Sequence, residues 1–213
     1  MIYRFLPLIL FCAFSFKPLN TADLEKNVIS NTDPKLIASN AKVALETKCK
    51  TFYTTIDANN LSLPKFDSFF AAFQGYEQLK AQGKITNEIL TVIDFSLSSI
   101  EERMWVIDMK TQKVILKSLV AHGRNSGVEF ATNFSNENES YKSSLGFYLT
   151  GEVYQGKHGL SLRLDGMEYG INDKARDRAV VIHGADYVSK KLARAQGYIG
   201  RSQGCPAVPF DVH

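Results

Sequence analysis

From residue 89 onward the chain is a succession of short apolar runs rich in β-branched and aromatic residues, separated by polar stretches. Runs of this length and composition are typical of β-strands. They cover 89–95, 104–109, 114–121, 147–153, 160–164 and 179–182. We therefore expect a mainly β fold with a mostly antiparallel sheet and a hairpin turn at 108–113.

Two amphipathic helices are predicted before the first strand. In the segment 33–54 an Asp-Pro pair supplies an N-cap and a first helical residue, and apolar residues recur every three or four positions. The segment 64–82 carries a stripe of aromatic residues and is followed by Gly83, a typical helix stop. We expect a small α-helical region over 23–88.

The charge balance limits the classes of partner. The chain has 25 basic and 22 acidic residues among 213, a net charge of +3, and no basic run of the kind that nucleic-acid binding needs. Its length and its 45% hydrophobic content suit one core with a helical appendage rather than two full domains. Nucleic acid is therefore not an expected partner.

The N-terminus carries a segment typical of exported proteins. Arg4 precedes an apolar stretch at 5–16, which is shorter than the about 20 residues that span a bilayer but suits a signal peptide. We expect a signal peptide over 1–22. Since no clear cleavage triplet follows, an uncleaved N-terminal anchor in the membrane stays the alternative.

Two cysteines, Cys49 and Cys205, lie beyond this segment. An even pair in an oxidising compartment can form a disulfide. Cys49, however, falls on the apolar face of a predicted helix, where cysteine is usually a small buried hydrophobe. Cys205 follows a turn with glycines at 200 and 204, which would hold its side chain away from a packed interior. These positions favour a reactive Cys205, with the disulfide as the alternative.

A histidine precedes this cysteine at a suggestive place. His183 directly follows the predicted strand at 179–182, and a short helix at 186–196 would carry the chain back so that Cys205 lies beside it. A free thiol is only about 3% ionised at pH 7, whereas an imidazolium neighbour can lower its pKa below 7. We expect Cys205 to act as nucleophile and His183 as its base.

Backbone groups and other side chains are candidates for the rest of the site. Gly200 and Gly204 would leave N–H groups free for a developing oxyanion, each worth on the order of 3 kcal/mol. His122 opens a polar, glycine-rich segment and either lines the site or is a structural histidine. The arginines that could clamp a carboxylate, although surface solvation is the default for each, are Arg124, Arg163 and, as the best exception, Arg201.

The remaining patterns give negative expectations and one loop. The histidines and acidic residues do not fall at metal-ligand spacings, and no glycine-rich phosphate loop is present, so no metal and no cofactor are expected. The stretch 125–144 is dense in Asn and Ser and predicts a long surface loop, of a length that often serves as a functional lid.

The segment 182–209 resembles the signature of the L,D-transpeptidase catalytic domain family (YkuD-like), in which a His-Gly pair precedes a Ser-x-Gly-Cys turn. Further stretches are similar to the murein L,D-transpeptidases of that family and appear in the same order along the chain. They cover 121–127, 143–148, 156–162 and 170–173. The resemblance extends over about residues 90–209.

The resemblance implies a β-sandwich catalytic domain, over 89–213, located in the periplasm or cell envelope. It implies that the chain is a cysteine-dependent peptidoglycan L,D-transpeptidase: Cys205 forms a thioester with a tetrapeptide stem, D-Ala is released, and an amine takes the acyl group. His183 would serve as base and then as acid, with the carbonyl of Gly184 orienting its ring. Ser202 and Arg201 match pocket positions of the family, and Gly204 and His122 complete the expected substrate and oxyanion site.

Two departures from the family pattern keep alternatives open. Gln203 stands where many members have histidine, and the segment 206–209 replaces the Arg or Asn that usually follows the cysteine. The alternatives are an L,D-carboxypeptidase, in which water resolves the thioester, and a non-catalytic peptidoglycan-binding protein. The resemblance also leads us to expect a further helix and a closing strand beyond His213.

Overall fold

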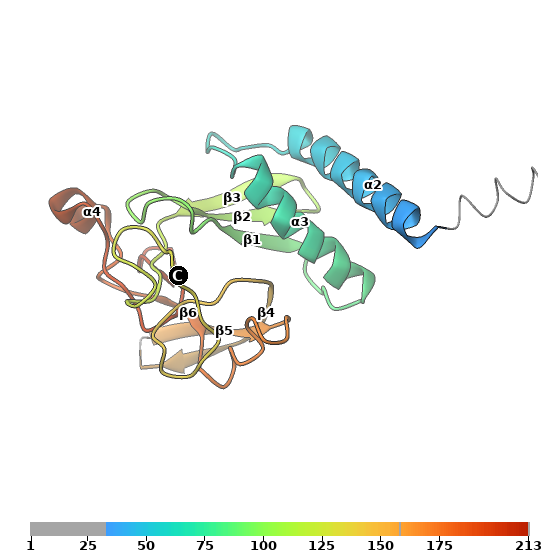
Figure 1. Cartoon of the computed structure of the whole chain (residues 1–213). Coiled ribbons are helices and arrows are strands. Elements are labelled where there is room, and N and C mark those ends of the chain that lie inside the picture. Colours follow the sequence, from blue (N-terminus) through green and yellow to red (C-terminus); the bar gives the residue numbers. More distant parts are fainter. Residues whose placement is uncertain (1–32, 158, 213) are drawn as a thin grey trace, which may run out of the picture. The chain divides into compact units, whose positions relative to one another are not determined.

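The computed structural model describes residues 33–157 and 159–212. The chain divides into two compact units, with the boundary between Ala44 and Leu45. The predicted signal peptide at 1–22 lies outside the described residues. The unit that begins at Leu45 contains every strand described below and is shown in Figure 1.

A three-stranded antiparallel sheet comes first in the chain. Strands β1 (Ile89–Ile93), β2 (Met104–Asp108) and β3 (Lys113–Ser118) follow one another in space as they do in sequence. The turn between β2 and β3 is held by the Asp108 carboxylate, which accepts hydrogen bonds from the backbone N–H groups of Lys110 and Thr111 at 2.9 and 3.0 Å. The predicted hairpin at 108–113 is confirmed.

The second sheet has four strands in the order β4 (Tyr148–Gly156), β5 (Gly159–Gly166), β6 (Val181–Gly184) and β7 (Ala207–Val208). The pairs β4–β5 and β5–β6 are antiparallel, whereas β6 and β7 are parallel. Strand β7 was not predicted because it contains only two residues between two prolines. The sequence placed His183 directly after the predicted strand at 179–182. In the structure His183 and Gly184 are instead the last two residues of β6.

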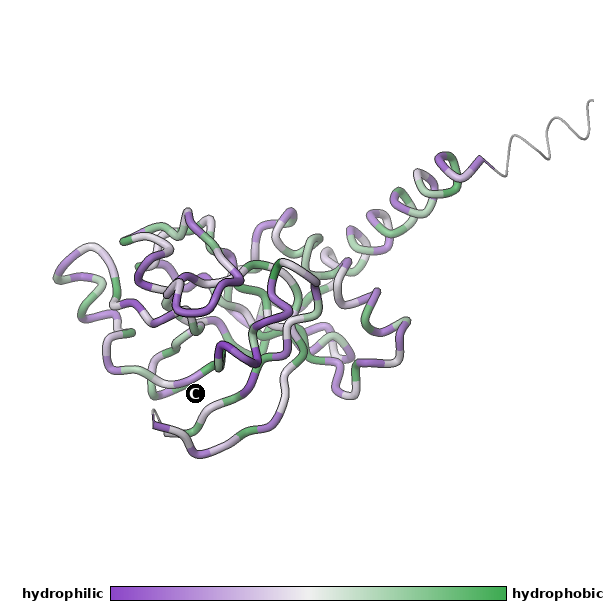
Figure 2. The backbone as a smooth tube through the Cα atoms, turned by 60° about the horizontal axis from the view of Figure 1, so that its bottom comes forward, coloured by the Kyte–Doolittle hydropathy of each residue, from purple (hydrophilic) through white to green (hydrophobic). Residues whose placement is uncertain are grey.

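Three helices lie in the described chain: α2 (Pro34–Thr55), α3 (Phe66–Ala81) and α4 (Lys190–Gln196). Figure 2 shows hydrophilic and hydrophobic positions alternating along α2, as its periodicity predicted. Helix α3 lies over β1–β3 in Figure 1, and its aromatic stripe is buried against that sheet. Phe69 and Phe73 are at most 1% exposed and share one hydrophobic cluster with Val92, Trp105 and Ile107. Burial of this face explains why the stripe specifies the helix.

A second cluster draws side chains from both sheets. Met104 of β2 and Val208 of β7 pack with Val120, and Leu116 of β3 and Ile182 of β6 lie against them. The two sheets and the few helices agree with the predicted mainly β class. The sandwich arrangement and the division into a helical region and a catalytic domain at residue 89 stay predictions.

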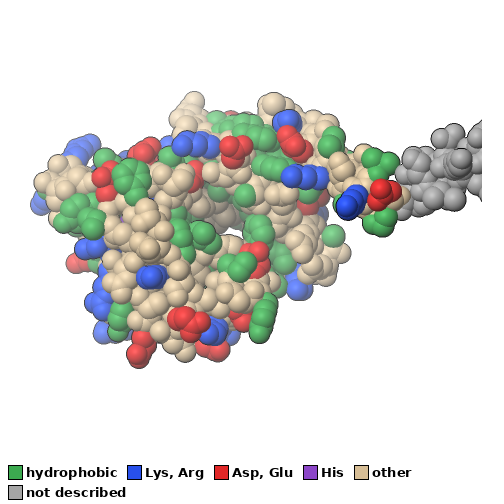
Figure 3. Space-filling view, viewed as in Figure 1, with side chains coloured by type: hydrophobic (Ala, Val, Ile, Leu, Met, Phe, Trp, Pro, Cys, Tyr) green, Lys and Arg blue, Asp and Glu red, His purple; other side chains and the backbone are tan. Residues whose placement is uncertain are grey.

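The surface is mixed in character. On the face shown in Figure 3, Lys and Arg side chains are interspersed with Asp and Glu and with hydrophobic side chains, and no large field of one sign stands out. Among the residues that the structure describes, no helix is long and apolar enough to cross a membrane.

Candidate active site

Cys205 lies in a tight turn between α4 and β7. The Ser202 hydroxyl closes this turn, because it donates to the carbonyl of Cys205 at 2.6 Å and accepts the N–H of Gly204 at 3.0 Å. Gly204 has a φ of 128°, which a residue with a side chain rarely adopts. The Cys205 thiol donates a hydrogen bond to the carbonyl of Ala179 at 3.7 Å. The turn therefore fixes the backbone of Cys205, and the carbonyl of Ala179 holds its sulfur.

His183 is brought to the same edge of the sheet by strand pairing. In the parallel pair of β6 and β7, His183 is in register with Ala207, two positions after Cys205. The ring is buried, and its Nδ1 lies 2.9 Å from the carbonyl of Gly184. Since a carbonyl only accepts, Nδ1 carries the proton and Nε2 is left as the basic nitrogen. The contact with Gly184 is the one that the resemblance implied.

The thiol of Cys205 is protonated at rest. Burial raises its pKa, while the N–H of Val181, the charge of Arg178 and its own N–H act in the opposite direction. This differs from the low-pKa thiol expected from sequence, because the turn holds the sulfur in a poorly solvated place. Such a thiol needs a base that takes its proton as it attacks, rather than a preformed ion pair with imidazolium.

The two glycine N–H groups expected to face an oxyanion are already occupied. The N–H of Gly200 donates to the carbonyl of Tyr187 at 2.8 Å, and that of Gly204 donates to Ser202. The expectation that they are free is wrong, since tight turns satisfy their own buried donors. The Ser202 hydroxyl is likewise engaged within the turn, which makes it a support of the turn in this structure.

His122 is fully buried and is paired with Arg103, a residue that the sequence did not single out. Arg103 Nη2 lies 2.7 Å from His122 Nδ1, so Nδ1 accepts and the proton sits on Nε2. The same guanidinium donates to the carbonyls of Leu97 and Val120 at 2.8 to 3.2 Å. Burial, together with the charge of Arg103, lowers the pKa of His122 to about 4, so its ring is neutral at pH 7.

The backbone of His122 supports the Cys205 turn directly. Its carbonyl accepts the N–H of Ser202 at 2.9 Å. The next residue, Gly123, donates to the hydroxyl of Ser143, which in turn donates to the carbonyl of Gly204 at 3.1 Å. His122 thus belongs to the framework of the site through its main chain, while its Nε2 has no hydrogen-bond partner among the described residues.

Each arginine proposed as a carboxylate clamp contacts other groups of the protein. Arg201 donates to the carbonyls of Gly127 and Arg124 at 3.1 and 3.3 Å. Arg124 stacks on the ring of Tyr141 at 3.9 Å, and Arg163 forms an ion pair with Glu152 at 2.7 Å. Each guanidinium is therefore engaged by the protein itself.

Sequence reasoning missed two further residues: Arg178, which acts on Cys205, and Tyr187, on which Cys205 acts. The positive charge of Arg178 favours the thiolate of Cys205. Burial, followed by the charge of Cys205 and that of Asp186, raises the pKa of Tyr187 to about 12. The only available signal was that Arg178 directly precedes the predicted strand at 179–182, in a connecting segment of the kind that often carries functional side chains.

The stretch 125–144 contains no helix or strand, as predicted, and it packs against the Cys205 turn. Ser143 is buried and bonds to both Gly123 and Gly204. A side chain at Gly123 would come within 2.5 Å of the carbonyl of Tyr141 and 3.0 Å of Gly204 Cα. Close backbone packing therefore joins this loop to the turn.

Both described cysteines are free. Cys49 is 0% exposed and lies in the cluster under α3, and burial raises its pKa to about 11. Within residues 33–157 and 159–212, no group of three or more His, Cys, Asp or Glu side chains is arranged to hold a metal ion.

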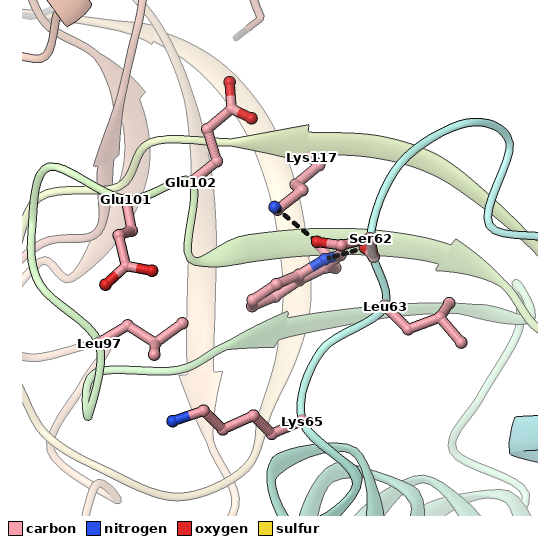
Figure 4. Close-up of a pocket in the computed structure, with 8 residues that line it drawn as sticks. Ser62, Leu63, Lys65, Leu97, Glu101, Glu102 and Lys117 are labelled. Carbon is pink, nitrogen blue, oxygen red and sulfur yellow. Dashed lines mark hydrogen bonds between the residues drawn. The ribbon is translucent and has the colours of Figure 1, made fainter.

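A cavity of about 300 Å³ lies outside this site, beside the paired residues Trp105 of β2 and Lys117 of β3 (Figure 4). Ser62 on one side accepts hydrogen bonds from Lys117 and Trp105, both at 2.7 Å. The rest of the lining combines opposite charges with apolar side chains and consists of Leu63, Lys65, Leu97, Glu101 and Glu102. None of the residues of the Cys205 turn lines it.

Comparison with known families gives one match. The family described as L,D-transpeptidase catalytic domain matches residues 59–213. No curated protein and no solved structure gives a significant match to the chain.

Proposed function

The chain belongs to the L,D-transpeptidase catalytic domain family, and we propose that it is a cysteine-dependent acyltransferase acting on peptidoglycan stem peptides. The observation that carries this proposal is the pairing of β6 with β7. It aligns His183 two positions from Cys205, while the contact with Gly184 leaves Nε2 of His183 as the basic nitrogen.

The proposed reaction has two acyl transfers. In the first, His183 Nε2 takes the proton of Cys205 as the sulfur attacks the carbonyl carbon that precedes the terminal D-Ala. The C–N bond breaks, the proton passes to the leaving nitrogen, D-Ala departs, and a thioester remains on Cys205. In the second, an acceptor amine attacks the thioester, the C–S bond breaks, and the proton returns to the sulfur.

The pKa of Cys205 fits this order of events. Since burial keeps the thiol protonated, the general base is needed at each attack and the resting enzyme carries no exposed thiolate. His183 is held in one tautomer for that task. The roles of Cys205, His183 and Gly184 are thus proposed from geometry together with family membership.

Family membership indicates the class of substrate and the general compartment. An L,D-transpeptidase domain acts on peptidoglycan, and such domains are typically cell-envelope enzymes. The apolar segment at 5–16 supports the finer proposal that a signal peptide at 1–22, or an uncleaved anchor, delivers the chain to the periplasm.

Incubation with a tetrapeptide muropeptide and an amine acceptor, followed by chromatography of the products, tests the proposal. We expect release of D-Ala and formation of an amide with the acceptor. Cys205→Ala should lower both by more than about 10³-fold, since the nucleophile is lost, whereas Cys49→Ala, a matched change in the core, should keep them. D-Ala release without the amide would identify the L,D-carboxypeptidase. Retention of muropeptide without any D-Ala release would identify a binding protein and refute the proposal.

A further inference from the structure

Two adjacent residue pairs face each other at the candidate site. Cys205 Sγ contacts the carbonyl of Ala179. The residues that precede them in sequence, Gly204 and Arg178, also lie close together. A side chain built on Gly204 would lie 3.3 Å from Arg178 Nη2. The pair Arg178–Ala179 therefore packs against the pair Gly204–Cys205, one residue before the strand β6 that carries His183.

The backbone at this contact has a positive φ on both sides, which is strained at Ala179 and is permitted at Gly204 by the absence of a side chain. Ala179 has a φ of 53°, in the left-handed region that residues with a side chain rarely adopt. Gly204 also has a positive φ, of 128°. Such strain persists only where the surrounding structure holds it, and it concentrates at functional sites.

The guanidinium of Arg178 is held rigidly by neutral groups. Nη1 donates to the carbonyl of Ser135 at 2.8 Å and to the hydroxyl of Ser144. Nη2 donates to the carbonyl of Lys142 at 2.7 Å and to the hydroxyl of Ser140 at 3.4 Å. These four bonds use the N–H groups that a bidentate clamp on a substrate carboxylate would need.

No carboxylate neutralises Arg178 within the described chain. The groups that accept its hydrogen bonds are all uncharged, and Glu137, the carboxylate that acts on it at a distance, is paired with Lys174 at 2.9 Å. A half-buried positive charge without a counter-ion stabilises an anion that forms beside it. The thiolate of Cys205 is an anion that the proposed reaction forms next to Gly204.

We propose that Arg178 is a positioning residue whose positive charge stabilises the thiolate of Cys205 as its proton leaves, while the carbonyl of Ala179 holds the neutral thiol in place. This inference rests on the proposed role of Cys205 as nucleophile. The other titratable groups near Cys205 are His183, in register with Ala207, and Tyr187, whose pKa the charge of Cys205 raises. The charge of Arg178 and that of Cys205 act on each other's pKa in opposite senses.

The experiment measures the rate at which iodoacetamide alkylates Cys205 in the full chain as a function of pH, read from the peptide that contains Cys205. Arg178→Gln removes the charge and keeps an amide donor. Because the thiolate loses a favourable charge, the apparent pKa should rise by roughly one unit, so that alkylation well below the pKa slows about tenfold. Arg178→Lys should restore most of the rate, since it keeps the charge.

Arg176→Gln is the matched control, because Arg176 lies two positions away but is paired with Glu152 and Asp165 on the surface. Its alkylation profile should equal that of the unmodified chain. If folded Arg178→Gln has an unchanged profile, or if Arg178→Lys is as slow as Arg178→Gln, Arg178 holds only the loop and the inference fails. Should Arg178→Gln not fold, Arg178→Met is measured in its place against the same criteria. Alkylation requires no muropeptide, so this result is independent of whether the chain shows transpeptidase activity.

Discussion

At the scale of single residues, the site depends on how protons are distributed among buried groups. The Cys205 thiol is neutral at rest, His183 offers one basic nitrogen, and His122 is kept neutral by burial beside Arg103. Each of these states follows from a specific contact rather than from the residue type. Because His122 resists protonation in the folded chain, the stability of the fold should depend on pH.

The pKa of His122 predicts acid sensitivity of the fold. It is about 4 in the folded chain and about 6.5 when unfolded, so between these values the unfolded chain binds more protons. Above pH 7 the titration of His122 does not change the free energy of unfolding. As the pH falls from 6.5 to 4, it lowers that free energy by about 3 kcal/mol in total. We expect urea unfolding of the unmodified chain to show this loss.

The control is His122→Gln, which does not titrate and keeps an oxygen that can accept from Arg103. Its free energy of unfolding should fall less steeply between pH 6.5 and pH 4 than that of the unmodified chain. Equal slopes in the two proteins would show that His122 already binds its proton in the folded state.

At the scale of elements, the Cys205 turn depends on close backbone packing. Gly204→Ala would place a methyl group 2.9 Å from the carbonyl of Lys142 and would also strain a positive φ. We expect a loss of about 2 to 3 kcal/mol in stability, together with altered alkylation of Cys205, because the turn must shift. Urea unfolding and alkylation by iodoacetamide measure the two effects.

Gly197→Ala is the matched variant for this change. Gly197 caps α4 with a φ of 77°, but no atom lies within 4 Å of the added methyl group. It should cost about 1 kcal/mol through backbone strain alone and leave Cys205 alkylation unchanged. If both variants behave alike, packing against Lys142 contributes nothing to the turn.

The same scale shows what sequence patterns can predict. The aromatic stripe of α3 and the β-rich runs predicted their elements because each pattern repeats along several residues. Strand β7 was not predicted, since two residues carry no periodicity. The roles of Arg103 and Arg178 were not predicted for a different reason. Both side chains donate to backbone carbonyls of distant segments, which leave no local pattern in the sequence. The prediction that the N–H groups of Gly200 and Gly204 are free was wrong, because both donate hydrogen bonds within the protein.

At the scale of the whole molecule, helices α3 and α4 and both sheets belong to the compact unit that begins at Leu45. The cluster of Phe69 and Phe73 covers the first sheet, and the cluster around Val120 joins the first sheet to the second. The site at β6 and β7 is therefore connected to α3 through two adjoining cores. This connection predicts cooperative unfolding.

Phe69→Ala tests that cooperativity. Phe69 is 0% exposed, and its removal should cost about 3 to 5 kcal/mol through lost burial and a cavity. Trp105 is the only tryptophan and reports on the first sheet, whereas alkylation of Cys205 in urea reports on the second. Both probes should shift to lower urea together. If only Trp105 shifts, the helical region and first sheet fold apart from the site.

The central claim is that Cys205 becomes acylated, and mass spectrometry of the protein tests it most directly. After brief incubation with a tetrapeptide muropeptide and no acceptor amine, the unmodified chain should gain the mass of the muropeptide minus D-Ala. Digestion should place the added mass on the peptide that contains Cys205, and hydroxylamine should remove it as expected for a thioester. An unchanged protein mass while D-Ala is released, or an adduct that persists in Cys205→Ala, would contradict the account.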